Sequence, residues 1–189
     1  MKATNETTIT RYDENAPINI WVGNLRKYNE GELCGDWIAL PLPEGMDSSD
    51  VFDALGIDID RDEYFIPDWD TSIKGLEYNE YADIDELSEQ AQAWLDLEDF
   101  EREAVNARMS LCGEDFGEAM EHRDDVIIWD GCRDMAEVAE RYADECGLLD
   151  SVPENLRYYF DYAALGRDME IEGCFDYSPE LGCMVEIIW

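Results

Sequence analysis

The chain alternates apolar with small or polar residues in the stretch Ile18-Asn19-Ile20-Trp21-Val22-Gly23-Asn24-Leu25. A period of two predicts a β-strand that buries one of its faces. A second strand is expected at Gly35-Asp36-Trp37-Ile38-Ala39-Leu40, and the polar residues 26–32 between them are expected to form a loop. A short helix over residues 50–55, capped by Ser48 or Ser49, and a third strand over residues 63–66 follow. Residues 1–70 are therefore predicted to form a small antiparallel sheet with a helix.

The hydrophobic period becomes helical at Asp83, which has the spacing of a capping pair with Glu86. One stripe of this first helix consists of Ile84, Leu87, Ala91, Trp94 and Leu95. A second helix is expected to turn Phe100, Ala104, Ala107 and Leu111 inward and to stop at Gly113. The outward faces of both helices are acidic, with Asp85, Glu86, Glu89, Asp96, Glu98, Asp99, Glu101 and Glu103. Residues 71–111 are predicted to form an acidic helical domain.

The last third mixes helical and strand-like segments. A short helix is expected over residues 116–120 and a strand over residues 126–129. The next helix ends at Gly147 and keeps helical spacing through Met135, Val138, Ala139, Tyr142 and Cys146. Another helix, opened by Ser151 and Pro153, is expected to end near Gly166, and residues 175–177 and 184–189 resemble closing strands. The prediction is an α+β protein of three small domains, residues 1–70, 71–111 and 112–189.

The charge excludes several classes of function. The 189 residues include 48 acids and 13 bases, a formal charge of -35 at pH 7. Such a chain is repelled by nucleic-acid phosphates and by anionic membranes, so we expect neither as a partner. Because 46% of the residues are hydrophobic and the acids are interleaved with aromatic residues, the acidity belongs to folded surfaces. No apolar stretch is long enough to span a membrane, and a soluble, cytoplasmic protein is expected.

The residue patterns do not favour an enzyme or a cofactor. The single histidine, His122, has no nucleophile motif beside it, and the six cysteines form no CxxC pair. Asp58, Asp60 and Asp62 resemble the start of a calcium loop, but Glu63 and Trp69 stand where that loop needs glycine and a bidentate glutamate. We therefore expect no catalytic residue, no metal and no cofactor.

The remaining signal is the charge itself. At the charge density of B-form DNA, 35 charges would extend over about 60 Å. A compact globule of this length is only about 40 Å across. One hypothesis is an elongated protein whose carboxylates stand where phosphates stand, a DNA mimic. The alternative is an acidic, salt-adapted protein-interaction module with no mimicry.

Several collinear stretches resemble the ArdA family of antirestriction proteins. The first runs over residues 21–41 and contains Tyr28-Asn29-Glu30-Gly31-Glu32-Leu33-Cys34-Gly35-Asp36-Trp37. Others are Asp62-Glu63-Tyr64-Phe65-Ile66-Pro67-Asp68-Trp69-Asp70, Tyr81-Ala82-Asp83-Ile84-Asp85-Glu86-Leu87 and Tyr159-Phe160-Asp161-Tyr162-Ala163-Ala164-Leu165-Gly166-Arg167-Asp168. The resemblance covers about residues 18–188; the residues before Ile18 have no counterpart in the family.

This resemblance implies an elongated homodimer that inhibits type I restriction-modification enzymes by occupying the DNA-binding groove of their specificity and methyltransferase subunits. It also implies that residues 135–149 are the family's antirestriction motif. We expect Met135, Val138, Ala139, Tyr142 and Leu148 of this motif to make packing or dimer contacts at least as readily as direct contacts with the enzyme. The expected mimic surface consists of Asp62, Asp68, Asp70, Asp83, Asp85, Glu86, Glu89, Asp96, Glu98, Asp99, Glu103, Glu114, Asp115, Glu118, Asp134, Glu137, Glu140 and Asp144.

Overall fold

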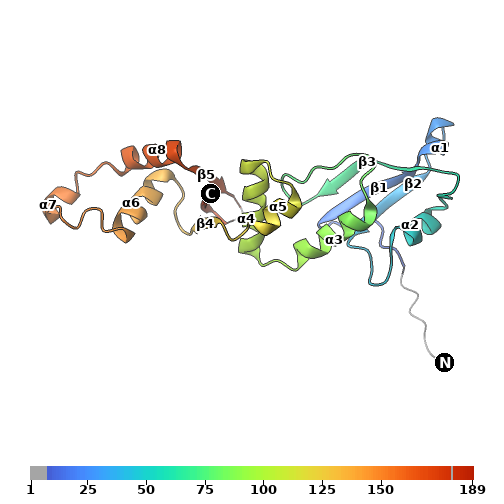
Figure 1. Cartoon of the computed structure of the whole chain (residues 1–189), viewed down its shortest axis with the longest axis horizontal. Coiled ribbons are helices and arrows are strands. Elements are labelled where there is room, and N and C mark those ends of the chain that lie inside the picture. Colours follow the sequence, from blue (N-terminus) through green and yellow to red (C-terminus); the bar gives the residue numbers. More distant parts are fainter. Residues whose placement is uncertain (1–7, 180) are drawn as a thin grey trace, which may run out of the picture. The chain divides into compact units, whose positions relative to one another are not determined.

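The computed structural model describes residues 8–179 and 181–189 (Figure 1). The chain divides into two compact units between Leu97 and Glu98. Each unit combines helices with a three-stranded antiparallel sheet, so the predicted α+β class is confirmed. The boundary falls within the predicted middle domain, residues 71–111, and the division into three domains stays a prediction.

The sheet of the first unit has the strand order β2-β1-β3. β1 (Ile18–Asn24) and β2 (Gly35–Leu40) are the strands expected from the alternating pattern. β3 (Tyr64–Thr71) is longer than the predicted strand because it continues past Pro67. Its pairing with β1 shifts by a residue between Trp21 and Gly23. A proline is tolerated there because β3 is an edge strand and the irregularity relieves the need for another N–H donor.

The core of the first unit lies on one face of this sheet. Ile18 pairs with Leu40 and Ile20 with Ile38, and all four side chains are fully buried. α2 (Ser48–Leu55) and α3 (Ile84–Leu95) contact β2. These helices contribute the buried residues Val51, Ile84, Leu87, Ala91 and Trp94, so only Leu95 of the predicted stripe is wrong, since it is exposed.

Two local predictions in this unit are wrong. The expected loop contains a short helix, α1 (Leu25–Asn29), which starts because the Asn24 side chain accepts a hydrogen bond from the backbone N–H of Lys27. The cap of α2 is Asp47 rather than Ser48 or Ser49. Asp47 accepts from the backbone N–H of Ser49, and Asp50 accepts in return from Asp47.

The second unit has the strand order β4-β6-β5, with β4 (Val126–Trp129), β5 (Cys174–Ser178) and β6 (Cys183–Ile187). All three strands were expected from the sequence. One core cluster joins the sheet to the following helix and consists of Trp129, Cys132, Val138 and Met184. A second cluster, Ala107, Val185 and Ile187, joins β6 to the end of α4 (Asp99–Ala107).

The helix α4 continues as a wider π-helical segment, η1 (Arg108–Cys112), which ends at Gly113 with a φ of 69°. This glycine was predicted as the stop. Ala104 and Ala107 face inward as expected, but Phe100 is 57% exposed, so its predicted burial is wrong. Phe100 occupies the first turn of α4, directly after the boundary between the two units.

Three further helices follow α5 (Phe116–Glu121): α6 (Met135–Glu145), α7 (Glu154–Arg157) and α8 (Tyr162–Glu172). α6 agrees with its prediction. The single helix expected between Ser151 and Gly166 is wrong, because Asp161 interrupts it by accepting from the N–H of Ala164 and so caps a new helix. α8 then continues past Gly166, which packs against α6.

Candidate functional site

Most of the predicted mimic carboxylates lie on the surface of their unit. In the first unit the exposed acids of this set are Asp68, Asp70, Asp83, Glu86, Glu89 and Asp96. In the second unit they are Glu98, Asp99, Asp115, Glu118, Asp134, Glu137, Glu140 and Asp144. Asp85 and Glu114 are half-buried, and Asp62 and Glu103 are buried.

Several exposed acids also hold helix N-termini. Asp83 accepts from the N–H groups of Asp85 and Glu86, and Asp134 accepts from those of Ala136 and Glu137. Asp115 does the same for α5 through the N–H of Glu118. A carboxylate at this position satisfies free donors and interacts favourably with the helix dipole. Part of the acidity therefore stabilises the helices.

Asp62 does not belong to the surface where the sequence placed it. Its side chain is 4% exposed and accepts hydrogen bonds from Asn24 Nδ2 at 2.7 Å and Arg26 Nε at 2.5 Å. The Arg26 guanidinium holds the pKa of Asp62 below its ordinary value. This carboxylate ties the start of α1 to the loop before β3, so its assignment to the mimic surface is corrected.

Glu103 and Glu114 likewise form hydrogen bonds inside the second unit. Glu103 accepts from the hydroxyl of Ser178 in β5 at 2.7 Å and is buried. Glu114 is paired through both oxygens with the buried Arg108, and this pairing lowers the pKa of Glu114. The assignment of Glu103 to the mimic surface is therefore wrong, as it is for Asp62. The carboxylate of Glu114 is already paired with Arg108.

Asp85 is the last of the four less exposed acids. Its two oxygens accept from the backbone N–H of Ser48 at 2.8 Å and from the Ser48 hydroxyl at 2.7 Å. These bonds join the start of α3 to the start of α2. Asp85 is thus a structural residue of the first unit that keeps part of its surface in solvent.

Many arginines form ion pairs with acids of their own unit. The pairs are Arg11 with Asp36, Arg26 with Asp62 and Glu30, Arg61 with Asp58, Arg102 with Asp99, Arg108 with Glu114, and Arg123 with Glu101. Such pairs cancel positive charge locally. The exposed carboxylates therefore dominate the field around each unit.

The segment expected to be the antirestriction motif, residues 135–149, is α6 and the turn after it. Val138 and Ala139 are buried, and Val138 packs against Trp129, Cys132 and Met184. Met135 packs at the edge of the same cluster, whereas Tyr142 is 40% and Leu148 47% exposed. Two of the predicted contact residues thus form the core of the unit itself, and Tyr142 and Leu148 are the ones that stay accessible.

The first family-like stretch owes its pattern to the packing of one indole. Trp21 lies over Gly23 and Gly35, where a Cβ would approach its ring atoms to 2.2 Å and 2.6 Å. Trp37 is the direct cross-strand partner of Trp21, and Phe65 contacts its ring edge at 6.1 Å between centroids. Sequence reasoning found the strands but missed this aromatic surface, although the tryptophans and glycines at matched registers were its signal.

In the described ranges, the histidine and cysteine side chains do not come together with acids to form a metal site. No group of three His, Cys, Asp or Glu side chains there could hold a metal ion, and no helix there could cross a membrane. All six cysteines, each inside those ranges, are free thiols. Burial raises the pKa of Cys112, Cys132 and Cys183, which keeps these thiols protonated and unreactive. His122 lies at the exposed end of α5, with Nδ1 3.4 Å from Glu114 Oε1.

The sequence comparisons agree with the resemblance. The family model of the antirestriction protein ArdA matches residues 20–180, which covers most of both units. No curated protein matches the chain. The matched family is one of inhibitors rather than of catalysts. The chain therefore belongs to the ArdA family of antirestriction proteins.

Proposed function

We propose that this protein inhibits type I restriction-modification enzymes by occupying the DNA-binding groove of their specificity and methyltransferase subunits. The exposed carboxylates of both units take the place of phosphates in that groove. A groove built for DNA presents lysines and arginines to a polyanion, and it attracts any surface of similar charge density. Because the chain belongs to an antirestriction family, a restriction-modification enzyme is the DNA-binding partner that we propose.

The observation that carries the proposal is the unequal use of charge. Arginines are paired inside the units, as Arg26 is with Asp62 and Arg108 with Glu114, whereas the acids of the surface set lie in solvent. With 48 acids and 13 bases, the chain cannot neutralise most of its carboxylates with its own cations. The excess is available to an external cationic partner.

The active form in this proposal is an elongated homodimer. Tyr142 and Leu148 suit a dimer contact because both are large, exposed side chains of the motif segment. Tyr142 lies on α6 between the acids Glu140 and Asp144, and Leu148 lies in the turn after this helix. Pairing of two copies doubles the length of groove that the carboxylates can occupy.

A competition titration tests the proposal. The purified protein is added to a type I methyltransferase core bound to labelled duplex DNA that contains its target. We expect stoichiometric displacement of DNA, with no cofactor, no covalent change and an affinity that falls as salt rises. Failure to compete at low salt, or competition that requires turnover of a nucleotide or a metal, would overturn the proposal.

A further inference from the structure

One face of the first unit's sheet carries a continuous row of aromatic rings. Trp21 and Trp37 are directly opposite each other on β1 and β2. The row continues from Trp21 to Phe65 and from Phe65 to Tyr28, with ring centroids 6.1 Å and 5.0 Å apart. At the other end Tyr12 meets Trp37 edge-on at 5.6 Å. This row, defined here as the aromatic face, lies on the side of the sheet opposite to Ile18, Ile20 and Ile38, because neighbouring residues of a strand point to opposite sides.

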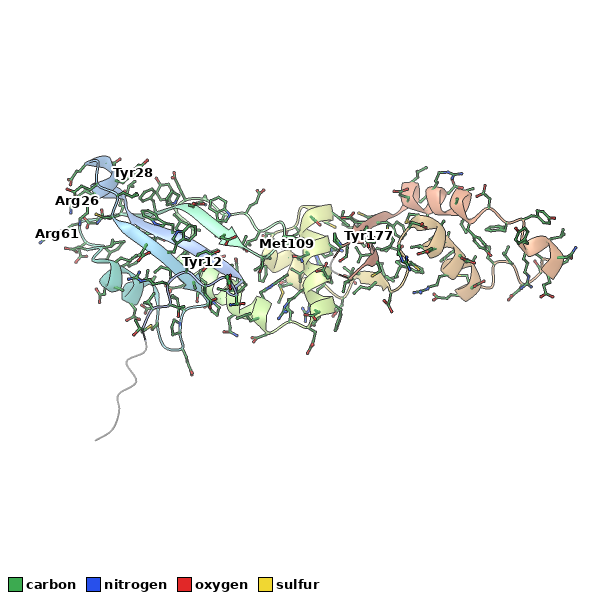
Figure 2. The ribbon with its side chains drawn as sticks, turned by 180° about the vertical axis from the view of Figure 1, so that it is seen from behind. Tyr12, Arg26, Tyr28, Arg61, Met109 and Tyr177 are labelled. Carbon is green, nitrogen blue, oxygen red and sulfur yellow. The ribbon has the colours of Figure 1, made fainter. Side chains whose placement is uncertain are left out.

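The aromatic face is partly open to solvent. Tyr12 is 48% and Tyr28 53% exposed, Trp21 and Trp37 are half-buried, and only Phe65 between them is buried. Figure 2 shows Tyr12 and Tyr28 toward opposite ends of the sheet. Rings of this size left accessible in a row are a common feature of protein-binding surfaces.

Two carboxylates lie on the same side of the sheet, along β3. Asp68 is the direct partner of Trp21, and Asp70 is the partner of Asn19, two residues along β1. Directly paired residues of antiparallel strands share a face. Tyr12 confirms this placement, since its ring meets Trp37 of β2 while its hydroxyl donates to Asp70 of β3. The aromatic face is therefore bordered by anionic groups that are both exposed.

Arg11 and Arg26, which stand close to Tyr12 and Tyr28 in the sequence, are engaged with other acids. Arg11 pairs with Asp36 at 3.5 Å, and Arg26 pairs with Asp62 and Glu30. Asp36 and Asp62 are thus the acids that these two arginines neutralise. Asp68 and Asp70 leave a negative edge beside electron-rich rings, which is complementary to a cation.

We propose that the aromatic face binds arginine side chains presented by a protein partner. A guanidinium is planar and weakly hydrated, so it can stack on an indole or phenol while it donates two hydrogen bonds to a neighbouring carboxylate. A lysine ammonium cannot combine the two contacts in this way. The face would select arginine over lysine at equal charge, which a surface of carboxylates alone would not do.

The test uses a synthetic hexa-arginine peptide and a hexa-lysine peptide of equal charge, titrated into the full chain at high salt to suppress diffuse attraction. The readout is the indole N–H resonances of Trp21 and Trp37 in two-dimensional NMR spectra. We expect the arginine peptide to shift both resonances and to bind several-fold more tightly than the lysine peptide. Equal affinity of the two peptides, or shifts spread evenly over the tryptophans, would overturn the proposal.

Two pairs of variants separate the face from general charge. Asp68→Asn with Asp70→Asn should weaken binding of the arginine peptide several-fold, whereas Glu170→Gln with Glu172→Gln, an equal charge change at exposed acids of the second unit, should not. Tyr28→Ala should weaken it about threefold, the loss expected for one exposed cation–π contact, and Tyr158→Ala, which removes an 89% exposed ring elsewhere, should have no effect. Equal weakening by test and control variants would show diffuse attraction and defeat the proposal. Because neither DNA nor a restriction enzyme is present, the result is independent of the DNA competition.

Discussion

Arg108 forms a bidentate ion pair with Glu114: its Nε donates to Oε2 at 2.9 Å, and its Nη2 donates to Oε1. The same guanidinium donates through Nη1 to the backbone oxygen of Ile188 at 3.3 Å and lies 5.3 Å from the ring of Trp189. With only 4% of the Arg108 side chain exposed, this cation connects the start of η1 to the loop between η1 and α5 and to the chain after β6. An acid expected on the mimic surface is in fact the counter-ion of a buried arginine.

Glu114→Gln should therefore destabilise the second unit. Removing one partner of a buried ion pair leaves the other charge uncompensated, and the loss should be about 3 kcal/mol at neutral pH. The pKa of Glu114 is lowered in the folded state, so its stabilisation is present above the unfolded pKa and is lost as pH falls through the folded value. Urea unfolding of the native and variant proteins should show a large difference at pH 7 that shrinks in acid.

The control for this prediction is Glu121→Gln, an exposed acid of α5. This substitution changes the net charge equally and should alter stability by less than about 0.5 kcal/mol at any pH. If both variants behaved alike, net charge rather than the Arg108 contact would control the stability of the unit.

Gly166→Ala should destabilise the contact between α6 and α8. A Cβ at this position would lie 2.3 Å from the backbone oxygen of Met135, so the two helices must move apart. Alanine is intrinsically better in a helix by about 1 kcal/mol, but overpacking of this kind costs roughly 1–3 kcal/mol. We expect a net loss of stability in thermal or urea unfolding.

Gly117→Ala is its matched control, because this glycine is also helical and the nearest atom its Cβ would meet, apart from its chain neighbours and its own helix backbone, is Asp115 Oδ1 at 3.4 Å. It should be neutral or stabilising. A Gly166→Ala variant as stable as the Gly117→Ala variant would mean that α6 and α8 pack less closely than the Gly166 contact indicates.

The local elements were largely predictable, and their partners were not. β1 and β2 follow from period-two patterns and β4 from a short apolar run, and α3 and α6 follow from helical stripes, with the cap of α3 and the glycine stop of α6 also expected. The burial of Glu103 depends on Ser178, 75 residues away, which no local pattern reveals. Asp62 depends in the same way on Arg26, 36 residues away. The break between α7 and α8 was missed because Asp161 can be read as a helix-surface acid or as a cap, and only the hydrogen bond to Ala164 decides.

The sequence predicts that the protein has an acidic surface, but it does not predict which acids form that surface. Composition reveals a large acidic excess, and most acids of any soluble chain are exposed. Which acids form caps and internal pairs depends on the tertiary structure. The structure therefore leaves a smaller set for functional tests, from which Asp62, Glu103 and Glu114 are removed.

Neutralising exposed acids of α3 and its end together should weaken inhibition far more than any one of them. The set Glu86→Gln, Glu89→Gln and Asp96→Asn avoids Asp85, whose bonds to Ser48 hold the unit together. Each single change should alter the inhibitory concentration by less than about threefold, as expected when binding is spread over many ionic contacts. The triple variant should weaken inhibition by at least an order of magnitude and reduce its salt dependence.

Circular dichroism is the control for the triple variant. Asp96 lies at the C-terminal end of α3, where a negative charge is unfavourable, and Glu86 lies in the first turn, where it is favourable, so the two replacements should offset each other in helix content. A single substitution that abolished inhibition in a folded protein would contradict distributed mimicry and indicate one dominant site.

Particle shape gives a further prediction from charge density. Charges spaced as in DNA need about 60 Å for 35 charges, more than the roughly 40 Å of a compact globule of this length. Small-angle scattering at low micromolar concentration should therefore report an elongated dimer. Tyr142→Asp, which adds charge to the exposed motif side chain, should shift the particle toward the monomer mass. A compact spherical monomer for the native chain would exclude the proposed geometry.

The response to dilute buffer separates the mimic from a salt-adapted protein. A salt-adapted surface needs screening by ions, so it should unfold when ionic strength falls. Here Asp83, Asp115 and Asp134 cap helices, the buried Asp62 binds Arg26, and Glu114 binds the buried Arg108. These attractive contacts become stronger as screening falls, and they offset part of the repulsion among the remaining carboxylates. Circular dichroism and tryptophan fluorescence should show a folded protein at millimolar ionic strength, with a urea midpoint that changes only modestly up to physiological salt. Loss of structure in dilute buffer that added salt restores would support the salt-adapted module instead.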